Sequence, residues 1–217
     1  MNSAKSDILG RIRRANQGQS TQRGADYSAI QRSYRQRTGD ETFSVIEKFI
    51  ERLHDYGSYV VRCREHEIPG TVGALLQERA KRRLLVGRGI DSKWLPDDID
   101  QLIDDGLSYE QIDRCDGVLT GCAAAIAVTG TIVLHHSPDQ GRRAITLIPD
   151  YHLCIVLEEQ IVATVPEGIR MIGNLGPGAI TTISGPSATS DIEMTRVKGV
   201  HGPRMLDVIV SAMDERR

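Results

Sequence analysis

Aromatic side chains are scarce in this chain of 217 residues, at 4% of the composition against 40% hydrophobic residues overall. The core must therefore be built mainly from Ile, Leu, Val and Ala, which is typical of a sheet covered by helices on both faces. A single core commonly reaches about 200 residues, so the length suits one larger α/β domain, with or without a helical extension.

Cysteine is also rare. The chain has four cysteines, and they form no C-x-x-C pair and no spacing typical of a zinc or iron–sulfur site: Cys63, Cys115, Cys122 and Cys154. Nothing in their arrangement indicates the disulfide framework of a secreted protein. We therefore expect a cytoplasmic protein that carries no metal ion, cofactor or cluster of its own.

Long apolar segments are lacking as well. Residues 1–7 are polar, which does not fit the apolar core of a signal peptide. Residues 117–134 carry no charge, but six of these 18 positions are Gly or Thr, and a Thr-Gly-Thr sequence divides the run. We expect a buried strand, a helix and a second strand there, and no transmembrane segment.

The net charge of -2 conceals an uneven distribution. Residues 1–38 hold eight Lys or Arg and two acids, which leaves 19 basic and 27 acidic residues in 39–217, so the two parts carry net charges of +6 and -8. Residues 4–16 show an amphipathic helical stripe. We expect residues 1–38 to be a basic N-terminal helix and linker arm that docks on a protein surface rather than on nucleic acid, and residues 39–217 to be the α/β domain.

Helical and apolar patterns alternate along the rest of the chain, which is typical of a mostly parallel sheet. The Ser-Pro-Asp-Gln-Gly sequence at 137–141 is typical of a hairpin turn, so we expect one antiparallel hairpin between 131–134 and 144–148. The predicted helices are 40–57, 71–82 and 159–172, and the other predicted strands are 58–61, 84–86, 152–157, 179–184 and 205–210.

A glycine pair, Gly87-Arg-Gly89, follows the predicted strand 84–86, at the place where a dinucleotide fingerprint would begin. The third glycine of that fingerprint is replaced by Ser92. A plain turn at the exit of the strand is therefore the favoured interpretation.

The loop Gly185-Pro-Ser-Ala-Thr189 gathers hydroxyl groups between a strand and a short helical pattern. Such a loop, at the carboxyl end of a strand and the start of a helix, is the usual position for ligands in open α/β sheets, so anion or carboxylate binding is one hypothesis. The helical pattern opens with a capping box, Ser190-Asp-Ile-Glu193, and a well-capped loop without any ligand is the alternative. The candidate ligand-binding residues here are Gly185, Pro186, Ser187, Thr189 and Glu193.

The sequence Val200-His-Gly-Pro203 follows after one or two helical turns, so His201 and Gly202 are expected near the same edge. Histidine suits proton transfer near neutral pH, which makes His201, with Asp191 to orient it, the candidate catalytic pair. A histidine held by a backbone carbonyl is the alternative. A Ser-His-Asp triad of Ser187, His201 and Asp191 lacks the nucleophile elbow and is disfavoured.

A third candidate loop is Val128-Thr-Gly-Thr131, a glycine turn flanked by hydroxyls that could cradle a phosphate through backbone amides. Thr129, Gly130 and Thr131 complete the candidate ligand-binding residues. A metal site is not expected, because no carboxylate or helical His spacing supports the remaining histidines and Cys154.

Several of these segments resemble the LUD-domain family, and in particular its lactate-utilisation branch. The resemblance rests on Ala125–Leu134, Thr146-Leu-Ile-Pro149, the S-G-P-S-x-T-x-D-I-E sequence at 184–193 and the G-V-H-G-P sequence at 199–203, and it extends to the opening Ile8–Arg13. The family pattern usually has Glu where this chain has Val128, which weakens a carboxylate role at that loop.

The resemblance implies a Rossmann-like α/β fold similar to the NagB/RpiA/CoA-transferase group. It also implies a subunit of an L-lactate utilisation system that oxidises L-lactate to pyruvate beside iron–sulfur partner subunits. We expect this chain to bind a small carboxylate or phosphate, or to serve only in assembly, rather than to be redox-active itself. The alternative is a stand-alone enzyme acting on a phosphorylated, nucleotide, folate or acyl-CoA substrate, as related folds do.

Overall fold

The computed structural model describes residues 3–16, 29–34, 37, 39, 42–189, 197–198 and 202–214. Its contacts divide the chain into two units, Met1–Arg35 and Gln36–Arg217. The first unit contains helix α1 (Ser3–Asn16), which confirms the helix expected from the amphipathic stripe. Ile8, Leu9 and Ile12 of this helix are exposed.

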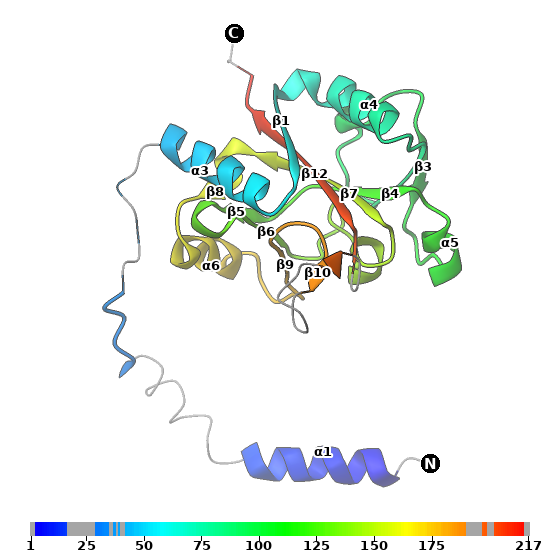
Figure 1. The fold of residues 1–217 in the computed structure, drawn as a ribbon. Helices are drawn as coiled ribbons and strands as arrows, with labels where there is room; N and C mark the ends of the chain where they lie inside the picture. Colours follow the sequence, from blue (N-terminus) through cyan, green and yellow to red (C-terminus); the bar gives the residue numbers. More distant parts are fainter. Residues whose placement is uncertain are drawn as a thin grey trace. The chain divides into compact units, whose positions relative to one another are not determined.

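The second unit is built on a six-stranded sheet in which every pair of neighbours is parallel (Figure 1). Strand β12 lies between β1 and β7 and is the longest strand of this sheet. In spatial order the strands are β1 (Tyr59–Arg64), β12 (Met205–Ala212), β7 (Tyr151–Leu157), β4 (Gly117–Thr120), β2 (Arg83–Val86) and β3 (Asp100–Ile103). The expected α/β class with a mostly parallel sheet is thereby confirmed.

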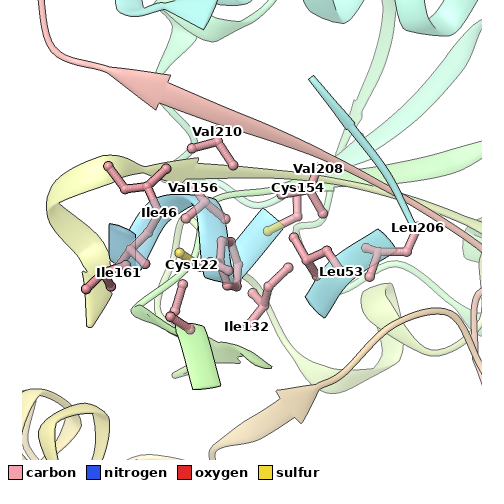
Figure 2. Close-up of a cluster of buried hydrophobic side chains, with 14 of the residues drawn as sticks. Ile46, Leu53, Cys122, Ile132, Cys154, Val156, Ile161, Leu206, Val208 and Val210 are labelled. Carbon is pink, nitrogen blue, oxygen red and sulfur yellow. The ribbon is translucent and has the colours of Figure 1, made fainter. Parts of the chain in front are cut away.

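Helices cover both faces of this sheet, which explains why its central strands are apolar almost throughout. Helix α4 (Ile68–Glu78) packs on one face, with Leu153 and Ile155 of β7 and Ile209 of β12. Helix α3 (Thr42–Asp55) packs on the other face, and Figure 2 shows its Ile46 and Leu53 beside Cys154, Val156 and Val208. Short helices α5 (Tyr109–Asp113) and η4 (Arg143–Thr146) close the second face near β2 and β4.

A second sheet of four strands lies on the α3 side, because its Ile132 and Ala125 belong to the same buried cluster. Its order is β8 (Ile161–Val162), β5 (Ala124–Ile126), β6 (Thr131–Leu134) and β9 (Thr181–Ile183). Helix α6 (Val165–Gly173) packs on β5 through Gly168 and Ile172. A further pair, β10 (Ala188–Thr189) and β11 (Val197–Lys198), is antiparallel.

An antiparallel hairpin is present and 131–134 is one of its strands, as predicted, but its other strand is β5 and not 144–148. It joins β5 to β6 through the 3-10 turn η3 (Ala127–Thr129), where a helix was expected, because Gly130 in the left-handed conformation ends that turn at once. Residues 144–148 are no strand: they belong to η4 and its exit, where Ile145 is fully buried against Ile112 and Val118. The helix expected over 159–172 is shortened by η5 (Glu158–Gln160) and β8.

The remaining short elements are η1 (Glu65–Glu67), before α4, and η2 (Ser92–Trp94), between β2 and β3. No helix in the described part of the chain is both long enough and apolar enough to cross a bilayer. The uncharged run 117–134 is divided among β4, β5, η3 and β6 instead.

Candidate functional site

A polar cavity of about 290 Å³ lies where β9 and the loop after it meet the start of β7 and β12. Leu206 and His152 line it, and each is the second residue of its strand. The loop after β9 thus leads to the amino ends of two parallel strands, not to the carboxyl edge of the main sheet as expected, because β9 belongs to the second sheet. The other lining residues are Arg143, Thr146, Thr181–Ala188 and Pro203.

The loop after β9 carries three of the predicted ligand-binding residues, Gly185, Pro186 and Ser187, into the lining of this cavity. Gly185 has φ +86°, and a Cβ there would lie 2.4 Å from Cβ of Tyr56, so only glycine fits. The amide of Ser187 donates to the carbonyl of Pro203 over 2.8 Å. The structure therefore brings the two Gly-Pro segments of the sequence together.

Not all of the predicted residues can be placed. Asp191, Glu193 and His201 lie outside the described residues, so the proposed catalytic pair stays a prediction. Thr189 is in β10, beside the cavity-lining Ala188. A Cβ on Gly202 would lie 3.9 Å from Cβ of Ser187, which puts Gly202 next to the cavity.

The Thr129–Thr131 turn lies behind the cavity rather than in its lining. Gly130 has φ +56°, and a Cβ there would lie 2.7 Å from Cβ of Arg52, so the glycine permits close packing on α3. The Thr131 hydroxyl lies 2.8 Å from the hydroxyls of Thr129 and Ser184. This turn supports the loop after β9 from behind.

Arg143 supplies a positive charge to the cavity. Its guanidinium donates to the carbonyl and the hydroxyl oxygen of Thr146, both over 3.1 Å, and it pairs with no carboxylate among the described residues. Its neighbours differ: Arg142 pairs with Asp104, and Arg204 pairs with Asp150. Arg143 is exposed, and a guanidinium without a carboxylate partner beside a cavity can bind an anion.

His152 is the other polar group of note, and only 1% of it is exposed. Its Nε2 lies 2.8 Å from Oγ1 of Thr120, and no described residue is hydrogen bonded to its Nδ1. Burial, together with the charge of Arg143, lowers the pKa of His152 to about 4, so the ring is neutral at pH 7. The sequence predicted neither Arg143 nor His152 as a binding residue.

The Gly87-Arg-Gly89 turn is filled by another part of the chain. A Cβ on Gly87 would lie 2.3 Å from the carbonyl oxygen of Pro138, and the amide of Gly89 donates to that same oxygen over 3.0 Å. The amide of Gly89, which would donate to the phosphate of a dinucleotide, therefore already donates to the carbonyl of Pro138. The plain turn favoured by the sequence is what the structure contains.

His135 and His136 are tied to backbone and hydroxyl groups. His136 Nδ1 lies 2.9 Å from the carbonyl of Gly141, and its Nε2 lies 2.8 Å from Oγ1 of Thr181. His135 Nε2 lies 3.2 Å from the carbonyl of Gly176. Over the ranges that the structure describes, no group of three or more His, Cys, Asp and Glu side chains could hold a metal ion.

Relatives of known name match this chain over most of its length, and a solved structure has a similar fold. Lactate utilization protein C of Deinococcus radiodurans is 48% identical over 169 residues, which cover 76% of this chain and 79% of that protein. Lactate utilization protein C of Oceanobacillus iheyensis is 26% identical over 190 residues, with coverage of 79% and 80%. The crystal structure of a DUF162-family protein from Deinococcus radiodurans is 40% identical, with a TM-score of 0.69, and the match covers 79% of this chain and 99% of that chain.

The matched region coincides with the α/β unit. The sequence profile of the LUD domain covers residues 46–211, from within α3 to within β12. The family resemblance inferred from the loop motifs is thereby confirmed, and this chain belongs to the LUD-domain family.

Proposed function

We propose that this chain is a ligand-binding subunit of an L-lactate utilisation system, and that the Arg143 cavity binds a small carboxylate. The name of its relatives, Lactate utilization protein C, supports the biological role. The observation that carries the binding role is the guanidinium of Arg143, which lines a polar cavity and has no carboxylate partner among the residues described.

The chemistry of the cavity suits a small monoanion. Arg143 offers N–H donors in the planar arrangement that matches a carboxylate, and the hydroxyls of Ser184 and Ser187 lie on the same lining. His152 adds no charge, because its ring is neutral at pH 7. A volume of about 290 Å³ is at the small end of ligand sites, which favours a metabolite of a few heavy atoms.

The same size argues against the alternative of a nucleotide, folate or acyl-CoA substrate. Those molecules need an extended groove and, for their phosphates, free backbone amides at a turn. The glycine turn after β2 is occupied by the carbonyl of Pro138.

Electron transfer is assigned to partner subunits in this proposal. Cys122 and Cys154 are buried, and burial raises the pKa of both thiols, that of Cys154 to about 12. Metal clusters are bound by thiolates, so these two side chains are poor cluster ligands. We therefore propose that this chain acts beside iron–sulfur subunits that accept the electrons from lactate.

Titration calorimetry on the full chain tests the binding role. L-lactate and pyruvate should bind to the wild type, and Arg143→Gln should weaken binding at least tenfold, because it removes the charged donor. Arg88→Gln is the matched control, since Arg88 is exposed and pairs with Asp105 away from the cavity. Unchanged affinity in Arg143→Gln, or no binding of any small carboxylate, would refute this role.

Capture of the tagged chain from its host, grown on lactate, tests the assembly. Cysteine-rich iron–sulfur proteins should be recovered with it. Normal growth on lactate after deletion of the gene would contradict the biological role, whatever the cavity binds.

A further inference from the structure

The cavity has a second polar feature besides its charge, a short chain of hydrogen-bonding groups that leads from His152 into the core. His152 Nε2 lies 2.8 Å from Thr120 Oγ1, and Thr120 Oγ1 lies 3.8 Å from Sγ of Cys154. Thr120 and Cys154 are fully buried, so no water replaces these contacts. The Thr120 hydroxyl thus has two acceptors for its single proton, the imidazole nitrogen and the sulfur.

These two acceptors permit two arrangements of the protons. When the Thr120 hydroxyl donates to Nε2, the ring proton is on Nδ1, and Nδ1 is a donor. When the hydroxyl donates to Cys154, it accepts from Nε2–H, and Nδ1 is an acceptor. When the Thr120 hydroxyl rotates and the neutral ring changes tautomer, Nδ1 of His152 therefore changes from a hydrogen-bond donor to an acceptor for a group in the cavity.

We propose that His152, positioned by Thr120, recognises the oxygen on carbon 2 of small 2-hydroxy and 2-oxo monocarboxylates, while Arg143 holds their carboxylate. The donor form of Nδ1 fits a keto oxygen, and the acceptor form fits a hydroxyl group. The site is thus expected to bind both oxidation levels of one carbon skeleton. This inference rests on the proposed carboxylate-binding role of the same cavity.

The geometry limits the ligand class further. Cavity-lining hydroxyls and Arg143 can bind any carboxylate, but Nδ1 of His152 is without a hydrogen-bond partner among the described residues unless the ligand supplies one. An acid without an oxygen on carbon 2 leaves Nδ1 in that state. Propionate, which differs from lactate only by the missing hydroxyl, should therefore bind about tenfold more weakly.

Calorimetry with L-lactate, pyruvate and propionate on the full wild-type chain tests this inference. L-lactate and pyruvate should bind with affinities within a few-fold of each other, and propionate about tenfold more weakly. Propionate binding as tightly as L-lactate would overturn the inference but leave the carboxylate role intact. No binding of any of the three would overturn both.

Two variants of Thr120 separate positioning from structure. Thr120→Ser keeps the hydroxyl and should retain the preference for L-lactate over propionate, whereas Thr120→Val should lose it. Nitrogen NMR of His152 gives a readout that a structural role would not move: the proton should be on Nδ1 with pyruvate bound and on Nε2 with L-lactate bound. If His152 has the same tautomer in both complexes, the proposed tautomer change is wrong. It is also wrong if folded Thr120→Val still prefers L-lactate over propionate.

Discussion

The hydroxyl oxygens of Thr131 and Ser184 lie 2.8 Å apart, although 53 residues separate them in the chain. Thr131 begins β6, and Ser184 follows β9 directly, so this contact joins the Thr-Gly-Thr segment to the loop that lines the cavity. The turn at Thr129–Thr131 therefore contacts the lining of the cavity through Ser184.

Replacing Thr131 with Val should remove this contact while keeping the shape of the side chain. We expect a loss of about 1 kcal/mol in the free energy of unfolding, because the buried hydroxyl of Thr131 is removed together with its bonds to Thr129 and Ser184. Carboxylate binding should weaken a few-fold as Ser184 loses its support. Urea denaturation and calorimetry measure the two effects, and Thr131→Ser, which keeps the hydroxyl, is the control. Equal stability and affinity in the Val variant would contradict this role.

The buried ring of His152 should make folding stability depend on pH. Burial and Arg143 lower the pKa of His152 to about 4 in the folded chain, against an ordinary value of 6.5. The unfolded chain therefore binds a proton that the folded chain does not between these values, so stability is lost as the pH falls from 6.5 toward 4. We expect a contribution of about 2 kcal/mol between pH 7 and pH 5.

Urea denaturation at these two pH values measures that loss, and His152→Gln should remove most of it. The control is His66→Gln. A hydrogen bond to Asp214 raises the pKa of His66, so its contribution has the opposite sign and is lost as the pH rises. An equally steep pH dependence in His152→Gln would show that the slope has another origin.

An ion pair between the end of α4 and strand β12 should also control stability. Asp207 accepts from the Nε of Arg79 over 2.8 Å and from the hydroxyl of Tyr151 over 3.1 Å, and its side chain is only 3% exposed. Asp207→Asn should lower the free energy of unfolding by about 3 kcal/mol, the low end for a broken buried pair, because Arg79 still reaches water. Tyr151→Phe removes one neutral donor and should cost about 1 kcal/mol. Similar losses in the two variants would contradict the charge argument.

The filled turn after β2 gives a prediction about packing. Gly87→Ala places a methyl group against the backbone of Pro138, which cannot move aside without shifting the 137–141 loop. We expect a loss of about 1–3 kcal/mol in thermal or urea denaturation. Gly73→Ala in α4 is the matched control, since a Cβ there meets nothing closer than 3.8 Å and alanine favours a helix. A neutral Gly87→Ala would mean that this turn is looser than described.

Most of the main sheet could be predicted because its strands and helices have clear periods. Helix α3 follows from the helical spacing of Phe49 and Leu53, and β12 follows from its continuous apolar run. The strand predicted at 144–148 was wrong because a short apolar run does not distinguish a strand from a turn that buries Ile145. Register and strand order depend on contacts between distant residues, which the spacing along one chain does not specify.

The cavity was predicted only in part. The glycine, proline and hydroxyl pattern correctly indicated that the loop after β9 and the segment at Pro203 meet. Arg143 carries no local signal, because the adjacent Arg142 looks the same in the sequence and pairs with Asp104. His152 looks like part of an apolar strand, and only the folded sheet shows that it borders a cavity.

Strand β12 has one more consequence, which concerns the order of events during synthesis. In the main sheet, β1 pairs with β12 and with no other strand over the described residues, and β12 also pairs with β7. When a ribosome makes this chain, β1 emerges early and has no neighbour to join until residues 205–212 have left the exit tunnel. A nascent chain interrupted before that point would expose β1 and one edge of β7 without their common partner, so molecular chaperones would be expected to hold it until β12 is made.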